Sequence, residues 1–331
     1  MVITKGGIYT GINVPVFINT SELVVLDHCN ITGIVCVSNV FGTQYGPPVN
    51  LAIRNSRFFS SAVKNPGDNS TSLVYLLGAK SVTVWDSYFC GQVSTKGALC
   101  AGGVVIWGGK PGSTEIVIGN CVFKDCSPSI QLSGFLQNPL IGIYGNQVLH
   151  TADYMHDDQI SLYQSGGIKG GMAMIQNNFL AWNPDAPRVP NSGGIVPDFE
   201  STYIHVIGNV SFNQGIGAYY DSGNTHLFEN NIIAGTSGLA YGYAIAIWKG
   251  GGFAKNNTVL WVIGPGGGQP FYLENAGSGN NPAPTGNDNV GDTGQVLLPD
   301  SQLTRQFLQN LYNDWLTNQL VGGVSYSASL K

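Results

Sequence analysis

A six-residue pattern that returns along most of the chain constrains this sequence more than any other feature. It reads apolar, any residue, Asn, two variable positions, apolar, as in Ile175–Leu180. The third position of successive copies falls at His28, Asn55, Asp86, Asn120, Asn146, Asn177, Asn209, Asn230 and Asn256. These positions are 21 to 34 residues apart. Repeats of roughly 20–50 residues predict a solenoid, in which each unit buries its apolar face by stacking on its neighbours.

The residues before each Asn indicate strands rather than helices. Segments 113–118 and 201–207 alternate apolar and polar residues with period two, which is the period of a strand. Asn adopts positive φ readily among non-Gly residues, so an Asn between two short strands predicts a sharp bend in every coil. Stacking of the coils would then place the Asn side chains in a ladder that hydrogen-bonds to neighbouring backbones.

This pattern resembles the right-handed parallel β-helix of the pectate-lyase-like superfamily, which includes polysaccharide lyases, glycoside hydrolases, uronan epimerases and phage tailspikes. The resemblance covers residues from about 10 to about 280 and implies three strands per coil, with an Asn ladder between the second and the third. The Arg-x-Pro-x-x-Arg segment of pectate lyases is absent, as are the Asn-Thr-Asp, Gly-His-Gly and Arg-Ile-Lys segments of polygalacturonases. The resemblance therefore implies the fold, and neither of these activities carries over.

We predict an all-β, right-handed parallel β-helix solenoid of about nine to ten coils over residues 1–276. A linker at 277–299 and a C-terminal segment at 300–331 follow. In the last segment, apolar residues lie four apart: Leu303, Phe307, Leu311 and Trp315. This spacing predicts an amphipathic helix with Asp300 or Ser301 as its N-cap. We expect this helix to cap the exposed end of the solenoid; contact with another subunit is the alternative.

Composition excludes several classes of partner and leaves the cysteines open. A net charge of −5 without a Lys/Arg run argues against nucleic acid, and no apolar segment reaches the length of a membrane span. No signal peptide is present in this numbering, which is compatible with a mature extracellular domain or with release by lysis as a virion component. The six cysteines all lie before residue 127 and form either disulfides or part of the solenoid core.

A functional face is predicted on the strand that precedes each Asn motif, which corresponds to the first sheet of the resembling family. Aligning these strands on their apolar residues, Ile216 with Ile195 among them, gives one outward column: Trp107, Ser133, Tyr163, Asp198, Tyr219, Trp248 and Glu274. Glu200, Asp221 and Lys249 lie close to it along the chain. Aromatic stripes of this kind bind sugars, because ring faces stack on the C–H faces of pyranoses.

Carboxylates within the stripe indicate acid/base chemistry on a glycan. Hydrolysis needs two carboxyl groups, and we predict Asp198 and Asp221 as the catalytic pair, with Glu200 as the substitute member. We predict that Trp107, Tyr163, Tyr219, Trp248, Lys249 and Glu274 bind the substrate. A hydrolase of this kind requires no cofactor. The alternative is that these carboxylates are solvated and have no catalytic task.

A second constellation precedes the strand of Tyr163. His156 could act as a general base, and Asp157 and Asp158 could hold Ca²⁺ by oxygen ligands, as a polysaccharide lyase requires. The cations available to neutralise a uronate are Lys169, Arg188 and Lys249. Paired Asp residues that only cap a turn are the alternative. We assign structural roles to the other histidines, which are His28, His150, His205 and His226.

Two functions follow from this reading. The first is an enzyme that binds and cleaves a polysaccharide or surface glycan, as a hydrolase or a lyase. The second is a non-catalytic structural or receptor-binding β-helix of a phage particle or cell surface, which forms a homotrimer or assembles with other virion proteins. Both functions predict an extracellular or virion-associated protein.

Overall fold

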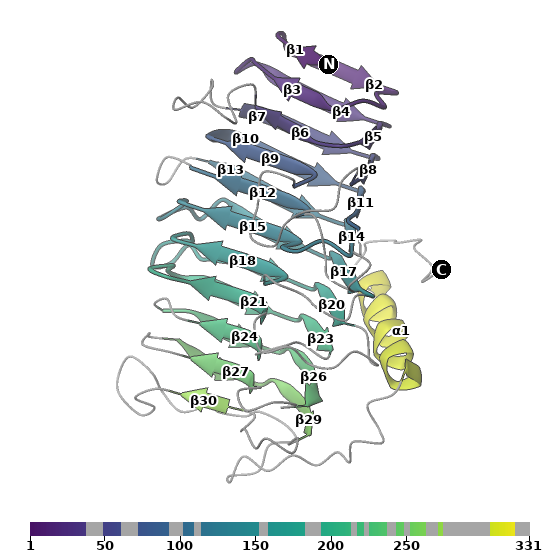
Figure 1. Ribbon diagram of the computed structural model, residues 1–331. Coiled ribbons are helices and arrows are strands. Elements are labelled where there is room, and N and C mark those ends of the chain that lie inside the picture. Colours follow the sequence, from purple (N-terminus) through teal and green to yellow (C-terminus); the bar gives the residue numbers. More distant parts are fainter. Residues whose placement is uncertain are drawn as a thin grey trace.

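The computed structural model describes residues 1–37, 49–60, 72–92, 102–108, 114–151, 158–182, 193–212, 217–221, 225–236, 243–247, 252–262, 271–273 and 305–321. Most of these residues form short parallel strands that wind around one elongated core, and a single helix lies beside them (Figure 1). The predicted all-β parallel β-helix is confirmed, because all three of its sheets are parallel and consecutive strands belong to different sheets.

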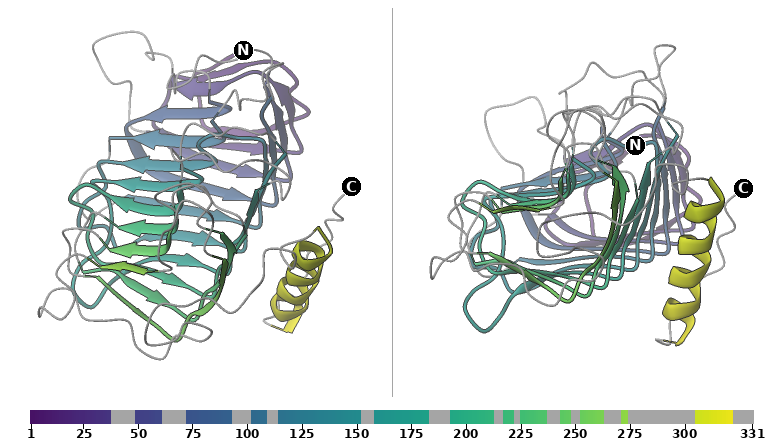
Figure 2. Two further views of the ribbon diagram at one scale, coloured as in Figure 1. Left: turned by 60° about the horizontal axis from the view of Figure 1, so that its bottom comes forward. Right: turned by 90° about the horizontal axis from the view of Figure 1, so that it is seen from below.

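Three sheets, named A, B and C here, form the walls of the solenoid (Figure 2). Sheet A contains β1 (Val2–Ile3), β3 (Val16–Ile18), β6 (Val35–Val37), β9 (Val74–Leu77), β12 (Val104–Trp107), β15 (Ile130–Ser133), β18 (Ile160–Tyr163), β21 (Gly193–Asp198), β24 (Gly217–Asp221), β27 (Tyr243–Ile247) and β30 (Phe271–Leu273). Sheet B contains β2 (Gly7–Thr10), β4 (Leu23–Asp27), β7 (Val49–Arg54), β10 (Ala79–Trp85), β13 (Glu115–Gly119), β16 (Ile141–Tyr144), β19 (Ala173–Gln176), β22 (Ile204–Ile207), β25 (Leu227–Glu229) and β28 (Phe253–Lys255). Sheet C contains β5 (Asn30–Thr32), β8 (Arg57–Phe59), β11 (Tyr88–Cys90), β14 (Val122–Lys124), β17 (Gln147–His150), β20 (Phe179–Trp182), β23 (Val210–Phe212), β26 (Ile232–Thr236) and β29 (Thr258–Val262).

The core is filled by the inward-facing residues of the three sheets, which alternate with outward residues along each strand. In β10, for example, Val82 and Val84 are fully buried. In sheet C the rings of Phe58, Phe89 and Phe123 stack on one another from coil to coil. Neighbouring ring centroids in this stack are 4.8 Å apart, with interplanar angles of 7° and 8°. This separation matches the roughly 4.7–4.9 Å spacing of hydrogen-bonded strands, so the rings repeat with the backbone.

The bend between sheets B and C uses two successive positions with different tasks. The first position has a positive φ and is occupied by His28, Asn55, Asp86, Asn120, Gly145, Asn177, Gly208, Asn230 and Asn256. The second position is buried and, over five successive coils, forms a ladder of Asn146, Asn178, Asn209, Asn231 and Asn257. The prediction of a single Asn column is thus wrong in register. Asn146 and Asn209 of the sequence motif belong to the ladder, whereas Asn177 belongs to the bend.

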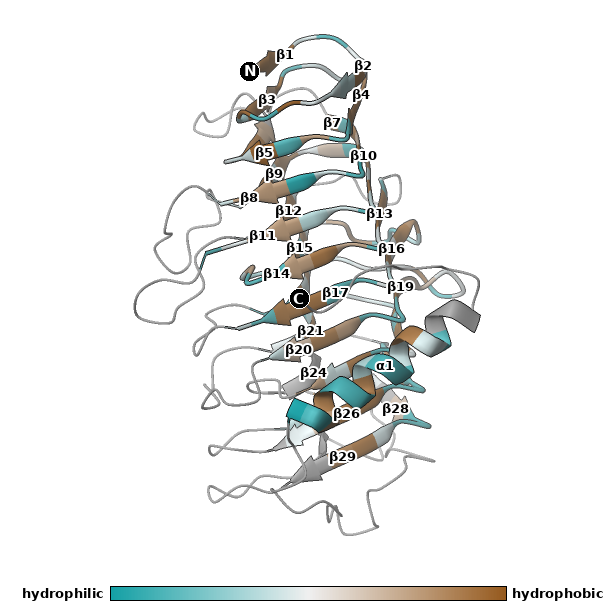
Figure 3. Ribbon diagram, turned by 90° about the vertical axis from the view of Figure 1, so that its right-hand side faces the viewer, coloured by the Kyte–Doolittle hydropathy of each residue, from teal (hydrophilic) through white to brown (hydrophobic). Residues whose placement is uncertain are grey.

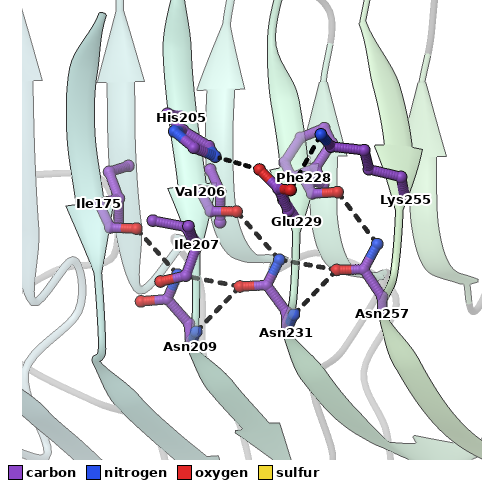
Figure 4. A network of polar contacts seen from close by, with 10 residues as sticks. All are labelled: Ile175, His205, Val206, Ile207, Asn209, Phe228, Glu229, Asn231, Lys255 and Asn257. Atoms are coloured by element: carbon purple, nitrogen blue, oxygen red, sulfur yellow. Dashed lines mark hydrogen bonds and ion pairs between the residues drawn. The ribbon is translucent and has the colours of Figure 1, made fainter. Parts of the chain in front are cut away.

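Each of the first four Asn residues of the ladder bridges three coils. The Asn178 Oδ1 atom accepts hydrogen bonds from the backbone and side-chain nitrogens of Asn146, both at 2.9 Å. Its Nδ2 atom donates to the Ile143 carbonyl oxygen at 3.0 Å and to Asn209 Oδ1 at 2.9 Å. Figure 4 shows the last three members of the ladder. Because these amides are buried and paired, the ladder fixes the stacking of successive coils.

A charged cluster lies beside the ladder on the outer face of sheet B (Figure 4). The Glu229 carboxylate accepts hydrogen bonds from Lys255 Nζ at 2.9 Å and His205 Nε2 at 3.1 Å. The hydrogen bond from Lys255 holds the pKa of the Glu229 carboxyl below its usual value, against the opposing effect of burial. Burial lowers the pKa of the His205 imidazole, and Glu229 opposes that shift. The contacts join three successive coils, which agrees with the structural role predicted for His205.

Two further histidines are buried. The His226 Nδ1 atom accepts a hydrogen bond from the Ile204 amide at 3.1 Å, and burial lowers the pKa of this imidazole to about 3. His150, at the end of β17, is 4% exposed, and its two ring nitrogens have no hydrogen-bond partner among the described residues. Burial lowers the pKa of the His150 imidazole to about 3 as well. Both rings are therefore neutral at pH 7 and belong to the core.

The C-terminal helix α1 (Arg305–Val321) lies against the flank of the solenoid rather than across its end (Figure 3). It packs on the outer face of sheet C at β20 and β23. The predicted amphipathic helix is confirmed over these residues, whereas the expectation that it caps the end of the solenoid is wrong. The predicted N-cap residues Asp300 and Ser301, and the predicted linker 277–299, lie outside the described residues.

Aromatic side chains hold the helix in place. Tyr312 and Trp315 are each 2% exposed, and both pack on the outward ring of Phe179, with centroid distances of 5.1 and 5.5 Å. The Trp315 Nε1 atom donates to the Asn177 carbonyl oxygen at 3.0 Å, and the Tyr312 hydroxyl donates to Gln147 Oε1 at 3.0 Å. The helix therefore covers an apolar part of sheet C and satisfies its own polar atoms there.

The five described cysteines are free thiols. Cys29, Cys36, Cys121 and Cys126 are buried, and Cys90 is half-buried. This supports the core assignment for Cys29, Cys121 and Cys126, which belong to the core cluster. Cys36 instead pairs in register with the half-buried Phe17 and Tyr75, and Cys100 lies outside the described residues. Within the described part of the chain, no helix is long and apolar enough to cross a membrane.

Candidate functional site

The outer column of sheet A follows the predicted order as far as β21. Strand pairing places Trp107 beside Ser133, Ser133 beside Tyr163, and Tyr163 beside Asp198. Trp107 and Tyr163 are 37% and 36% exposed, although the sheet beneath them is buried. This part of the predicted column is confirmed, and it places two exposed aromatic rings two strands apart, at roughly twice the strand spacing of about 4.8 Å.

The predicted column is wrong beyond β21. Ile195 pairs with Tyr219, and Tyr219 pairs with Ile245. Asp221 pairs with Ile247. Because the side chains of Ile195, Ile245 and Ile247 are fully buried, Tyr219 and Asp221 occupy register positions of the inward columns rather than of the column that contains Asp198. The predicted pair of Asp198 and Asp221 therefore lies on neighbouring strands but not in one outward column.

Several predicted site residues lie outside the described residues. These are His156, Asp157, Trp248, Lys249, Glu274 and Arg188, and their roles stay predictions. Asp158 is described, and its Oδ1 atom accepts a hydrogen bond from the Gly193 amide at 2.8 Å, which joins two coils. Among the residues that the structure describes, no group of three or more His, Cys, Asp or Glu side chains is arranged to hold a metal ion.

An inserted residue distinguishes the end of β21 from the equivalent points of earlier coils. A single residue with positive φ follows β9, β12, β15 and β18: Gly78, Gly108, Gly134 and Gln164 respectively. After β21 two such residues occur in succession, Phe199 with φ 27° and Glu200 with φ 59°. The register of the two coils is restored at the next position, where the Ser165 amide donates to Ser201 Oγ at 3.1 Å. The extra residue is therefore a bulge confined to this turn.

The bulge places the Phe199 ring on the outer surface of the sheet. Phe199 stacks on Tyr163 with a centroid distance of 5.3 Å and an interplanar angle of 13°. Phe199 is 49% exposed, so the paired rings form an open aromatic platform. A positive φ at a bulky residue is a rare conformation that costs on the order of 1–3 kcal/mol, and such conformations concentrate at functional sites.

Two carboxylates border this aromatic platform of Tyr163 and Phe199. The Asp198 Oδ1 atom accepts a hydrogen bond from the Phe199 amide at 2.8 Å. The Glu200 Oε2 atom accepts a hydrogen bond from Gln164 Nε2 at 3.1 Å. Both contacts hold the turn.

Buried serines fix the turn from below. Ser201 Oγ donates to the Leu162 carbonyl oxygen at 2.7 Å, and Ser165 Oγ accepts from the Phe135 amide at 3.2 Å. Ser165 and Ser201 are fully buried. The platform thus stands on hydrogen-bonded turns of two adjacent coils, and its geometry is set before any ligand arrives.

Phe199 and Gln164 were not predicted as site residues. The signal for Phe199 is a change of spacing: Ser165 follows Ile160 by five positions, whereas Ser201 follows Ile195 by six. The aligned strands and the paired serines reveal this extra residue only once the coil register is known.

Comparison of the chain with protein-family models, with curated proteins and with solved structures finds no match. The fold, a parallel β-helix, is therefore established by the strand arrangement itself.

Proposed function

We propose that this protein binds a polysaccharide along the outer face of sheet A and cleaves it by hydrolysis beside the platform of Tyr163 and Phe199. The observation that carries the proposal is this open pair of stacked rings, built by an inserted residue and bordered by two carboxylates. Exposed ring faces stack on the C–H faces of sugars, and acceptor oxygens at the ring edge satisfy sugar hydroxyls. Trp107, two strands away, extends the surface along the solenoid axis.

Asp198 and Glu200 are the carboxyl pair that we assign to the reaction. One carboxylic acid donates its proton to the glycosidic oxygen as the bond from the anomeric carbon to that oxygen breaks. The other, as a carboxylate, takes a proton from the attacking water, whose oxygen forms the new bond, or attacks the anomeric carbon itself before water releases the sugar. The pair replaces Asp198 and Asp221, since Asp221 does not share the outward column of Asp198.

The resemblance of the repeat to the pectate-lyase-like superfamily supports a carbohydrate substrate and an extracellular or virion-associated site of action. It also keeps lyase chemistry open to test, with His156 as base and Ca²⁺ held by Asp157 and Asp158. The hydrolase that we propose needs no such cofactor.

A second candidate function is glycan binding without cleavage, as in a receptor-binding protein of a phage particle or cell surface that forms a homotrimer or joins other virion proteins. It is favoured by one observation: Asp198 and Glu200 both accept hydrogen bonds within their own turn. A structural role for the two carboxylates would explain those contacts.

The test is incubation with a panel of soluble neutral and uronic-acid polysaccharides, with reducing ends and unsaturated uronates measured in parallel. We expect reducing ends to appear without unsaturated products, and to disappear in Asp198→Asn and Glu200→Gln. Phe199→Ala should weaken binding of the same polymer in affinity electrophoresis. The control is Glu115→Gln, an equal change of charge at an exposed residue of sheet B.

Each alternative result has a distinct reading. Binding that depends on Phe199 without any product supports the non-catalytic function. Unsaturated products that persist in both carboxylate variants overturn the hydrolase and assign the chemistry to the segment around His156. No binding to any polymer, in the wild type as in Phe199→Ala, overturns the carbohydrate function as a whole.

A further inference from the structure

Sheet B carries a pair of outward aromatic rings of its own, on a different wall of the solenoid from sheet A (Figure 2). Trp85 ends β10 and Tyr144 ends β16, and Gly119 of the intervening strand β13 pairs in register with both. The preceding residues Val84 and Ile143 are fully buried, so the side chains of Trp85 and Tyr144 point to the outer face. The two rings therefore belong to one outward column, with a glycine between them.

Two glycines allow these rings to lie along the sheet. A Cβ atom on Gly119 would collide with the Cε3, Cζ3 and Cη2 atoms of Trp85. A Cβ atom on Gly142 would collide with the Cε2, Cζ and hydroxyl oxygen atoms of Tyr144. These atoms include the far end of each side chain, so both rings lie low over the backbone instead of standing away from it. A larger residue at either glycine would displace the ring above it.

Polar groups flank this sheet B platform of Trp85 and Tyr144 at both ends of its column. Arg54 pairs in register with Trp85, and its guanidinium group bonds to Asp27 Oδ2 at 3.1 Å. Gln176 pairs in register with Tyr144 on the opposite side. An aromatic surface with hydrogen-bonding groups at its ends suits a sugar chain, whose C–H faces stack on the rings while its hydroxyl groups need polar partners.

The platform is too small for a stable protein partner. Trp85 is 36% exposed, the same fraction as Tyr163, whereas Tyr144 is half-buried. Among the residues of the fully described strands β10, β13 and β16, Trp85 is the only exposed large apolar side chain. Stable protein interfaces bury roughly 800 Å² on each partner around several apolar anchors. Two rings that lie low on a sheet instead offer the contact area of a few sugar units.

We propose that the sheet B platform is a second carbohydrate-binding site, which takes no part in cleavage and attaches the protein to the surface of an insoluble polysaccharide. Rings that lie along an outer wall can meet sugar chains that are fixed side by side in a solid. The inference goes beyond the proposed cleavage on sheet A and depends on different residues, so each can fail without the other.

Adsorption to solids tests the platform. The full chain is mixed with microcrystalline cellulose, chitin and insoluble mannan, and the protein left in solution is measured after sedimentation. We expect adsorption to at least one of the three solids, with an affinity about tenfold or more lower in Trp85→Ala and a smaller loss in Tyr144→Ala. Trp85→Phe keeps an aromatic ring and should retain part of the affinity. Circular dichroism establishes that each variant is folded before its adsorption is measured.

A variant of sheet A separates the two surfaces. Phe199→Ala should adsorb to the solids as the wild type does, and Trp85→Ala should cleave soluble polysaccharide at the wild-type rate. Three results would each overturn this inference: unchanged adsorption of Trp85→Ala, adsorption lost in Phe199→Ala instead, or no adsorption of the wild type to any of the three solids. Adsorption that depends on Trp85, in a protein that cleaves no soluble polymer, supports this inference while the proposed hydrolysis fails.

Discussion

The outer faces of sheets A and C both carry aromatic side chains, but in the part of the chain that the structure describes only the face of sheet C is covered by another element. On sheet C, Phe179 lies beneath Tyr312 and Trp315 of α1, and all three side chains are buried. On sheet A, the rings of Trp107, Tyr163 and Phe199 are between 36% and 49% exposed. The helix thus covers the aromatic residues on sheet C, whereas those on sheet A stay partly exposed among the described residues.

This difference helps to decide whether an exposed aromatic residue of a solenoid indicates a binding surface. A solenoid has outward positions on every strand, so some exposed apolar residues are expected. Phe199 on sheet A differs from such residues, because an inserted residue with an unfavourable φ places its ring on the surface. A turn without the insertion would not contain this residue. Aromatic residues on sheet C contribute to stability, and we expect those on sheet A to contribute to binding.

The largest expected effect comes from comparing tryptophans on the two faces. Trp315→Ala should lower the free energy of unfolding by about 3–5 kcal/mol, because it removes a buried ring and its hydrogen bond to Asn177. Trp107→Ala should cost less than about 1 kcal/mol, because that ring is already partly solvated. Urea unfolding of both variants checks the difference; equal losses would mean that the two faces are equivalent.

Low pH should reduce the free energy of unfolding through His150. This residue lies in β17, the sheet C strand whose residues Gln147 and Leu149 contact α1 and the residues packed around it. The pKa of this imidazole is about 3 in the folded chain and about 6.5 when unfolded, so the unfolded state binds a proton first. The stability from this group is complete above pH 6.5 and falls toward pH 3, by about 2–3 kcal/mol at pH 4.5.

Unfolding of His150→Leu as a function of pH measures this contribution. Between pH 6 and pH 4 the free energy of unfolding should fall with decreasing pH in both proteins. The slope for His150→Leu should be smaller than that of the wild type by about 1.4 kcal/mol per pH unit. His226 remains in both proteins and supplies a matched internal reference, since its pKa is also lowered to about 3 by burial. An unchanged slope would show that the His150 ring is protonated without unfolding.

A smaller effect is expected from the hydroxyl that ties the helix to sheet C. Tyr312→Phe should destabilise the protein by about 1–2 kcal/mol, because Gln147 Oε1 loses its buried donor while the ring packing stays. Tyr163→Phe is the matched change on sheet A and should alter stability by less than about 0.5 kcal/mol. Thermal or urea unfolding separates these values, and a reversed order would contradict the comparison.

The smallest expected effect on stability belongs to Phe199. Phe199→Ala should change the free energy of unfolding by about 0.5 kcal/mol or less, since the ring is half exposed. The same variant should lose most of the glycan affinity, which affinity electrophoresis measures on the same preparation. A large loss of stability with unchanged affinity would move Phe199 from the binding surface to the scaffold.

Local sequence signals predicted the solenoid and the helix, but they predicted neither the register of the Asn ladder nor the surface on which the helix packs. The strand period and the repeated Asn are local properties, so the fold followed from them. The bend and the ladder are adjacent positions that accept Asn equally well, which is why the motif alone could not separate Asn177 from Asn178. The docking site of α1 depends on contacts with residues more than a hundred positions away, such as Gln147.

The candidate site was predicted in part for the same reason. Trp107, Tyr163 and Asp198 share a column because each lies three positions after a residue of one inward column, namely Val104, Ile160 and Ile195. The prediction failed at Tyr219 because both Ile216 and Tyr219 fit an inward position in the sequence. The sequence alignment placed Ile216 beside Ile195, and an error of three positions, an odd number, moves every side chain of a strand to the opposite face. Only the pairing with Ile195 decides between them.

The stack of Phe58, Phe89 and Phe123 has a mechanical consequence. Because its rings repeat at the spacing of the strands, stretching the solenoid along its axis separates rings and interstrand hydrogen bonds at the same displacement. The coils that share the stack should therefore resist tension as one block and rupture in a single event under a pulling force. Coils beyond the stack, which lack these rings, should peel away one at a time at lower force.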